Sequence, residues 1–191
     1  MARAAGFTLI EMMVTIALMC ILTMLAMPSF TTWVANNKVR TVSDSLQNGL
    51  RFAQSEALRR SRPMVFSLTN SAAPDKSLTA AENGSNWSIN VSKSSLDASS
   101  AFVQAGVLPD VASGVSITGL AAICFNAMGR LAVNPDTGVN GANCGTGSPV
   151  FTYIVNATGS DRPLRVLVGL GGQVRMCDPA RKLADSPDGC P

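Results

Sequence analysis

The chain has 191 residues, enough for one domain of ordinary size and one long helix. Charged residues make up 14% and hydrophobic residues 47%, and the apolar excess is concentrated near the N-terminus. The net charge of +3 is too small to indicate nucleic acid by itself. Histidine is absent, which excludes Ser-His-Asp and Cys-His nucleophilic arrangements and every histidine-based metal site.

An apolar run begins just after the start of the chain. Between Phe7 and Phe30 the only ionisable side chains are those of Glu11 and Cys20. About 20 apolar residues are enough to cross a bilayer as a helix. In a secretory signal peptide the cleavage site follows the apolar stretch, whereas here the small residue Gly6 precedes it, behind the leader MARAAG. A cut after Gly6 would leave the membrane segment on the mature protein.

Glu11 is the one carboxylate in this run. A carboxylate near the hydrocarbon costs roughly 2.5–3.5 kcal/mol on insertion scales, so it needs a partner. After a cut behind Gly6, a new α-amino group would stand at Phe7, about one helical turn away. The corresponding amine of a neighbouring subunit could neutralise Glu11 across a helix–helix contact. The alternative is that Glu11 lies in the headgroup region of an ordinary anchor helix. Cys20 is expected to act as a small apolar side chain.

Pro28 lies near the end of the apolar run. Proline removes a backbone donor and loosens the helix around it. Pro28 is therefore either a kink at the exit from the membrane or, in a filament, a point at which the anchor segment stretches.

The next segment has the pattern of an amphipathic helix that ends near Ser61-Arg62-Pro63. With the anchor it makes about 55 residues of nearly continuous helix, about 80 Å long, whose apolar stripe needs a sheet to cover it. The basic run 59–62 is typical of a solvated helix end that complements the dipole, and the alternative is contact with nucleic acid or lipid headgroups. The stripe consists of Val39, Val42, Leu46, Leu50, Ala53 and Ala57.

The remainder of the chain reads as short strands separated by turn residues. The glycines between 169 and 172 predict a hairpin between the last two strands, because glycine allows positive φ. The layout is α+β, one long helix against one or two antiparallel sheets. The expected strands are Met64–Leu68, Trp87–Val91, Ala101–Gln104, Gly114–Ile117, Ile123–Asn126, Val150–Val155, Leu164–Gly169 and Gln173–Cys177.

Four cysteines lie outside the apolar run, namely Cys124, Cys144, Cys177 and Cys190. An even number behind a membrane-targeting N-terminus predicts two disulfides in an oxidising compartment, with three connectivities open. We favour the local pairs Cys124–Cys144 and Cys177–Cys190, because each fastens an otherwise untied loop. The Cys177–Cys190 bridge should stabilise the folded protein by ~3 kcal/mol. A zinc site made by all four is the alternative, but the chain has no Cys-x-x-Cys pair.

The sequence Gly6-Phe7-Thr8-Leu9-Ile10-Glu11 resembles the prepilin-peptidase site of type IV pilins and type II secretion pseudopilins. The resemblance implies cleavage between Gly6 and Phe7, N-methylation of Phe7, and Glu11 as the assembly carboxylate. Pro28 falls where such helices often carry a proline. The implied partners are the prepilin peptidase, other major and minor pilins, and the inner membrane. The implied location is a single pass with the head in the periplasm, followed by the pilus at the cell surface.

Stretches of the amphipathic helix and of the head resemble the GspH/FimT/FimU family, among them 52–60, 86–91, 124–131 and 172–177. This resemblance implies a pilin-like fold and a minor pilin of a type IV pilus, at the tip or in the complex that primes assembly. The alternative in the same class is the minor pseudopilin H of a type II secretion system. The expected division is a leader (1–6), a transmembrane assembly helix (7–30), its amphipathic continuation (31–62) and a β-rich head (63–191).

The tail is the basis of a third alternative, a DNA-binding minor pilin for natural transformation. FimT-like pilins that take up DNA carry a Gly-Arg-x-Arg motif, and the matching positions here read Gly172-Gln173-Val174-Arg175, without the first arginine. Arg175, Arg181 and Lys182 could contact phosphates, but aspartates lie among them and no aromatic residue offers stacking, so DNA affinity should be weak. We expect no catalytic residue, metal, cofactor or small-molecule substrate.

Overall fold

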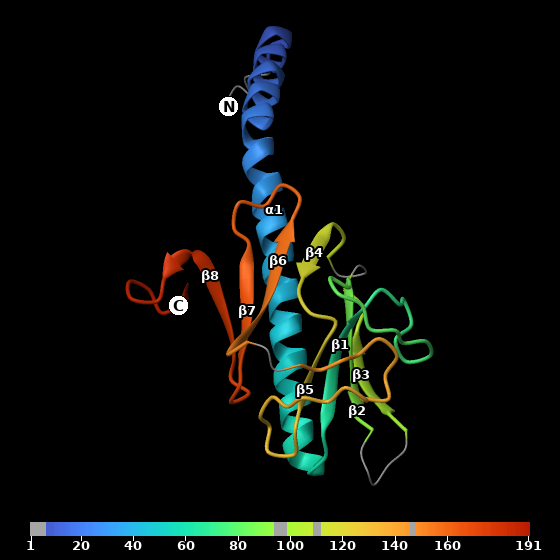
Figure 1. The fold of residues 1–191 in the computed structure, drawn as a ribbon. Helices are drawn as coiled ribbons and strands as arrows, with labels where there is room; N and C mark the ends of the chain where they lie inside the picture. The colour runs from blue at the N-terminus through green and yellow to red at the C-terminus, as the bar shows by residue number, and fades with distance from the viewer. Residues whose placement is uncertain (1–6, 94–98, 109–111, 146–147) are drawn as a thin grey trace, which may run out of the picture.

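The computed structural model describes residues 7–93, 99–108, 112–145 and 148–191. One helix, α1 (Leu9–Arg60), precedes all the strands and runs the length of the molecule (Figure 1). The chain then continues through β1 (Met64–Thr69), β2 (Asn86–Val91), β3 (Ala101–Gly106), β4 (Val115–Thr118), β5 (Ala122–Phe125), β6 (Val150–Ala157), β7 (Leu164–Gly169), β8 (Val174–Lys182) and β9 (Gly189–Cys190).

Helix α1 starts and stops at recognisable caps. Thr8 is the N-cap, with extended backbone, and forms a capping box with Glu11. Ser61 closes the other end in the left-handed conformation at φ 51° and donates its N–H back to the last turn. Pro63 follows, and proline cannot continue a helix. The helix thus lies within the predicted segment and ends just before the predicted stop.

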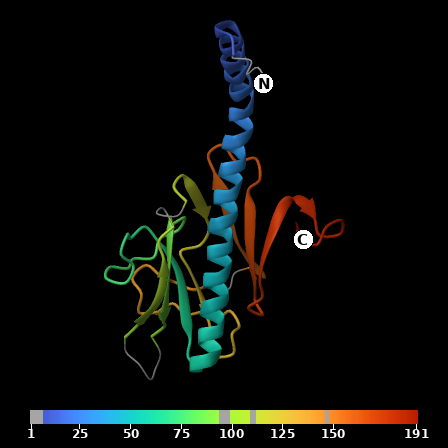
Figure 2. The ribbon, with the colours of Figure 1, turned by 180° about the vertical axis from the view of Figure 1, so that it is seen from behind.

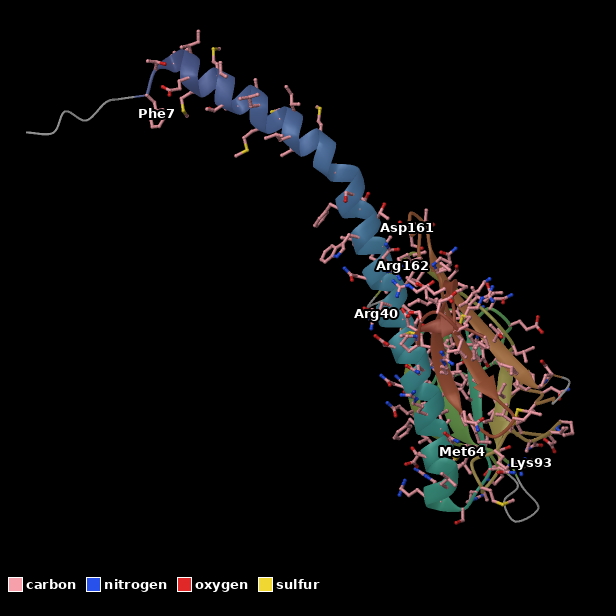
Figure 3. The ribbon with its side chains drawn as sticks, turned by 90° about the vertical axis from the view of Figure 1, so that its left-hand side faces the viewer. Phe7, Arg40, Met64, Lys93, Asp161 and Arg162 are labelled. Carbon is pink, nitrogen blue, oxygen red and sulfur yellow. A yellow bond between two sulfur atoms is a disulfide. The ribbon has the colours of Figure 1, made fainter. Side chains whose placement is uncertain are left out.

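The two halves of α1 are not collinear. The segments Leu9–Met24 and Ser29–Arg60 are bent by 41° relative to one another, and Pro28 lies between them. Figure 3 shows the N-terminal half leaving the head at an angle. Among the described residues, no single straight helix is long and apolar enough to cross a membrane, whereas this bent pair meets the criteria of length and composition.

The head contains two sheets, ordered β3-β2-β1-β5 and β4-β6-β7-β8-β9. All pairings between named strands are antiparallel except that of β8 with β9. Seen from behind, the second half of α1 lies across both sheets (Figure 2). These findings confirm the α+β, pilin-like fold expected from the sequence.

The main core lies between α1 and the inner faces of the two sheets. The predicted helical stripe is fully buried there, since the side chains from Val39 to Ala57 along it are at most 1% exposed. Phe66 of β1 stacks on Trp87 of β2 at 5.8 Å between centroids, and meets Tyr153 of β6 edge-on at 6.3 Å. These aromatic contacts connect the two sheets under the helix.

The first sheet is covered on its outer face as well. Every residue of β1 and β2 is buried, which two faces of packing require. On the outer side Val65 packs in a second apolar cluster with Val139 and the disulfide-bonded Cys124 and Cys144. The long connection before β6 therefore lies against the sheet and completes its burial.

The hairpin between β7 and β8 forms as predicted, with Val168 paired to Val174 and Gly172 at φ 90°. The prediction that the last strand ends at Cys177 is wrong, because β8 continues to Lys182 and pairs in parallel with β9. Pro179 argued against a strand at this point of the sequence, because proline lacks a backbone donor. In the structure it lies within β8, beside a register shift in the pairing with β9.

Candidate functional site

The N-terminal half of α1 extends away from the head (Figure 3). Every side chain from Phe7 to Met24 is exposed, and the large apolar side chains there keep between 52% and 79% of their surface. A continuous apolar surface of this kind marks a site of contact with lipid or protein. This half of the helix is the first candidate functional site.

Glu11 lies at the start of this surface, within reach of the N-cap. Its backbone N–H donates to Thr8 Oγ1 at 3.3 Å, and its carboxylate accepts from the Thr8 backbone N–H at 3.5 Å. The sequence analysis missed this capping box, although the spacing Thr-x-x-Glu before an apolar run is its signature. Phe7 is 79% exposed, and the predicted cleavage residue Gly6 lies outside the described residues.

The C-terminal tail is the second region with predicted site residues. A disulfide joins Cys177 to Cys190 and closes it, which is the local pairing favoured from the sequence. Arg175 donates to the backbone carbonyls of Pro187 at 2.8 Å and Gly189 at 2.9 Å. The guanidinium of Arg175 therefore holds the tail loop in place, a role that sequence reasoning did not anticipate.

Asp178 is the electrostatic centre of the tail. It is 3% exposed, and Arg162 donates to it at 2.6 Å from the β6–β7 loop. This hydrogen bond, with one from the Ala180 backbone, holds the pKa of the Asp178 carboxyl below its usual range. Arg181 donates to Asp188 at 2.9 Å, whereas Lys182 is exposed. Two of the three cations considered for DNA are thus engaged within the tail.

The other disulfide joins Cys124 of β5 to Cys144, with the Cα atoms 5.6 Å apart. Around it, Asn134 and Cys144 exchange backbone hydrogen bonds of 2.9 and 3.1 Å. The bridge pins the loop that covers the outer face of the first sheet, which is again the local pairing. No group of three or more Cys, Asp and Glu side chains within the described ranges is placed to hold a metal ion.

The basic run at the end of α1 is largely engaged in ion pairs. Arg59 and Arg60 both donate to Glu56, which is 6% exposed. The two guanidiniums lower the pKa of Glu56 to about 2. This arrangement agrees with a helix end stabilised by local charge rather than with a basic recognition surface.

The described geometry, a long helix with a free apolar half and a two-sheet head on its other half, defines a pilin-like protein. The prokaryotic N-terminal methylation motif matches residues 1–27, and the model of type II transport protein GspH matches residues 42–172. Because the latter match covers more than half of the chain, the protein belongs to the GspH family. Members of this family are structural pilin subunits and not enzymes.

A solved structure shares this fold. The type IV minor pilin FimU of Pseudomonas aeruginosa superposes with a TM-score of 0.52 at 18% identity, covering 78% of this chain and 95% of that one. A second crystal form of FimU gives a TM-score of 0.49 at 18% identity, with 74% and 94% coverage. No curated protein matches the chain. The N-terminal motif and helix indicate a membrane-anchored pilin. They also indicate processing by prepilin peptidase and association with other pilins.

Proposed function

We propose that this protein is a minor pilin of a type IV pilus, incorporated at or near the tip or in the complex that primes assembly. The observation that carries the proposal is the free half of α1, apolar on all sides and containing one carboxylate, Glu11. A helix that is apolar all round requires a bilayer or a bundle of other helices. A subunit that passes from the inner membrane into a filament meets both environments in turn.

In this proposal the peptidase cuts between Gly6 and Phe7, and the Phe7 amine is then methylated. Glu11 meets the corresponding amine of a neighbouring subunit as the helices pack. Its bond to the Thr8 N–H is 3.5 Å long and exposed, so it is weak and can be exchanged for a charged donor at small cost. The cap therefore holds Glu11 near the helix start until a neighbour arrives.

The bend around Pro28 belongs to the same proposal. A helix that lacks one backbone donor can adjust its direction where the anchor meets the head. Such an adjustment would let the head keep one orientation relative to the membrane and another relative to its neighbours in the filament.

Mass spectrometry of sheared surface filaments tests the proposal. We expect the chain in that fraction, beginning at an N-methylated Phe7. A chain that begins at Met1 or Ala2, or that stays entirely in the membrane fraction of cells with normal filaments, would contradict it.

A second candidate is favoured by the family model, which describes a type II transport protein. The chain would then be the minor pseudopilin of a secretion machine, with the same leader, helix and Glu11. Deletion of its gene separates the two. A minor pilin deletion reduces surface filaments and leaves secretion intact, whereas a pseudopilin deletion does the reverse.

A further inference from the structure

A cleft of about 360 Å³ lies between α1 and strands β7 and β8 of the second sheet. Its walls include Trp33 and Arg40 from the helix, Arg162 from the β6–β7 loop, and Asp178 from β8. Figure 3 labels Arg40 and Arg162 at the end of the head from which the N-terminal half of the helix departs. Neither the pilin fold nor the proposed role in assembly assigns this cleft a function.

The cleft has a fixed shape because the β6–β7 loop is attached to the helix. Asn36 donates to the Asp161 carboxylate at 2.7 Å, and the Asp161 backbone N–H donates back to the Asn36 side chain at 3.3 Å. Arg162 is the next residue, and it lines the cleft together with Arg40. The two arginines thus face one opening from separate, positioned elements.

The cleft wall carries two arginines and two aspartates, so its formal charges sum to zero, but both arginines keep guanidinium donors that can bind an anion. The carboxylates in its wall are already paired, since Asp178 accepts from Arg162 at 2.6 Å and Asp188 accepts from Arg181 at 2.9 Å. Arg40 has only a 3.9 Å contact with Asp44, and 69% of its side chain is exposed. Its guanidinium can therefore take a further acceptor, and arginine matches phosphate oxygens with two parallel hydrogen bonds.

The position of the cleft along the helix indicates which anion reaches it. About 20 residues counted from Glu11 cross the hydrocarbon, which ends near Phe30. Phe30 and Trp33 are exposed and in contact, with ring centroids 5.9 Å apart, and tryptophan is enriched at the membrane–water interface. Asn36 lies about 5 Å beyond Trp33 along the axis, so the mouth of the cleft borders the headgroup layer. Arginine side chains on a helix reach back toward its N-terminus and toward the interface.

We propose that, before the subunit enters a filament, this cleft binds a phospholipid headgroup, with the phosphate between Arg40 and Arg162 and Trp33 against the glycerol region. The inference rests on the proposed membrane anchor. It gives the head a fixed orientation on the membrane surface, which the anchor helix alone does not supply because of its bend. Entry into a filament then requires release of the lipid.

The test uses the full-length chain in nanodiscs of phosphatidylcholine and phosphatidylglycerol with a trace of phospholipid that carries a photoreactive diazirine on its headgroup. We expect labelled peptides from both sides of the cleft, residues 33–40 and 161–164. Arg40→Gln should reduce this labelling several-fold, because its exposed side chain can be changed without unpairing a buried group. Arg130→Gln is the matched control, since Arg130 is an exposed arginine beside the C-terminal end of α1 and should leave the labelling unchanged.

Several results would overturn the proposal. Labelling confined to residues 30–34 and indifferent to Arg40→Gln would mean that the aromatic pair touches the bilayer while the cleft does not. Absence of labelling at residues 33–40 and 161–164 would mean that no headgroup occupies the cleft. A parallel probe with the diazirine on the acyl chain should label residues 12–30, and its failure to do so would overturn the membrane anchor, and this proposal with it.

Discussion

The two halves of α1 have the same backbone and opposite surroundings. In the first half every described side chain up to Met24 is exposed, whereas in the second half a stripe that includes Leu46 and Leu50 is completely buried under two sheets. The second half gains its stability inside its own chain, and the first half must gain it from lipid or from sibling helices. The described folding contacts therefore lie in the head and the second half of α1, and we propose that the anchor serves association.

The largest difference is expected when a leucine is replaced by alanine in each half of α1. Leu46→Ala should lower the free energy of unfolding by about 2–5 kcal/mol, because it removes a fully buried side chain and leaves a cavity. Leu18→Ala, at a position that is 55% exposed, should leave head unfolding unchanged. Urea unfolding of the full-length protein in detergent, followed by tryptophan fluorescence, measures both. Similar losses would show that anchor and head unfold as one unit.

The tail disulfide should have the next largest effect. Replacing Cys177 and Cys190 with serine removes a constraint worth ~3 kcal/mol in the chain-entropy model. We expect faster tryptic cleavage after Arg181 and Lys182, and mass spectrometry of the digest measures it. Serine at both Cys124 and Cys144 is the control that should leave these sites protected. Unchanged cleavage in the tail variant would mean that Arg175 and Asp178 hold the tail without the bridge.

A smaller effect concerns acid stability, and it belongs to the head. Folding lowers the pKa of Glu56 from 4.5 to about 2 and lowers that of Asp178 below 3.8. Groups with depressed folded pKa values stabilise above their unfolded pKa, and this stabilisation is lost as the pH falls through the folded pKa. Thermal unfolding should therefore be level above pH 4.5 and decline below it. Glu56→Gln should flatten part of that decline, and an unaltered profile would exclude Glu56 as a cause.

The smallest effect is expected at the helix start. Thr8→Ala removes the N-cap and should destabilise the first turn by about 1 kcal/mol. Because the first turn of α1 lies away from the head (Figure 3), the unfolding midpoint of the head should not move. Amide hydrogen exchange near Leu9 reports the local change, and a shifted midpoint of the head would contradict the separation of the two halves.

The features that the sequence predicted are those recorded in local patterns. The helical stripe appears as a period of three and four, the β7–β8 hairpin as glycines between strands, and each disulfide as a pair of cysteines around an untied loop. The Thr8–Glu11 cap was also recorded locally and was overlooked. The processing site expected between Gly6 and Phe7 stays a prediction, because Gly6 lies outside the described residues.

The features that the sequence did not predict depend on contacts between distant segments. The Asn36–Asp161 pair joins residues 125 positions apart, and neither side chain alone indicates the other. The strand β9 has two residues, too few to show an alternation, and exists because Arg175 and the disulfide bring it to β8. Tertiary contacts of this kind override local propensity.

The central claim is that the charge of Glu11 serves contact between subunits, and Glu11→Gln tests it most directly. Glutamine keeps the length of the side chain and the capping box, since either residue can accept at that position, but it removes the charge. The account predicts that Glu11→Gln subunits are processed and membrane-bound, yet are depleted from sheared filaments relative to wild type. Incorporation of Glu11→Gln at the wild-type level would show that Glu11 is only a helix cap, and would contradict the account.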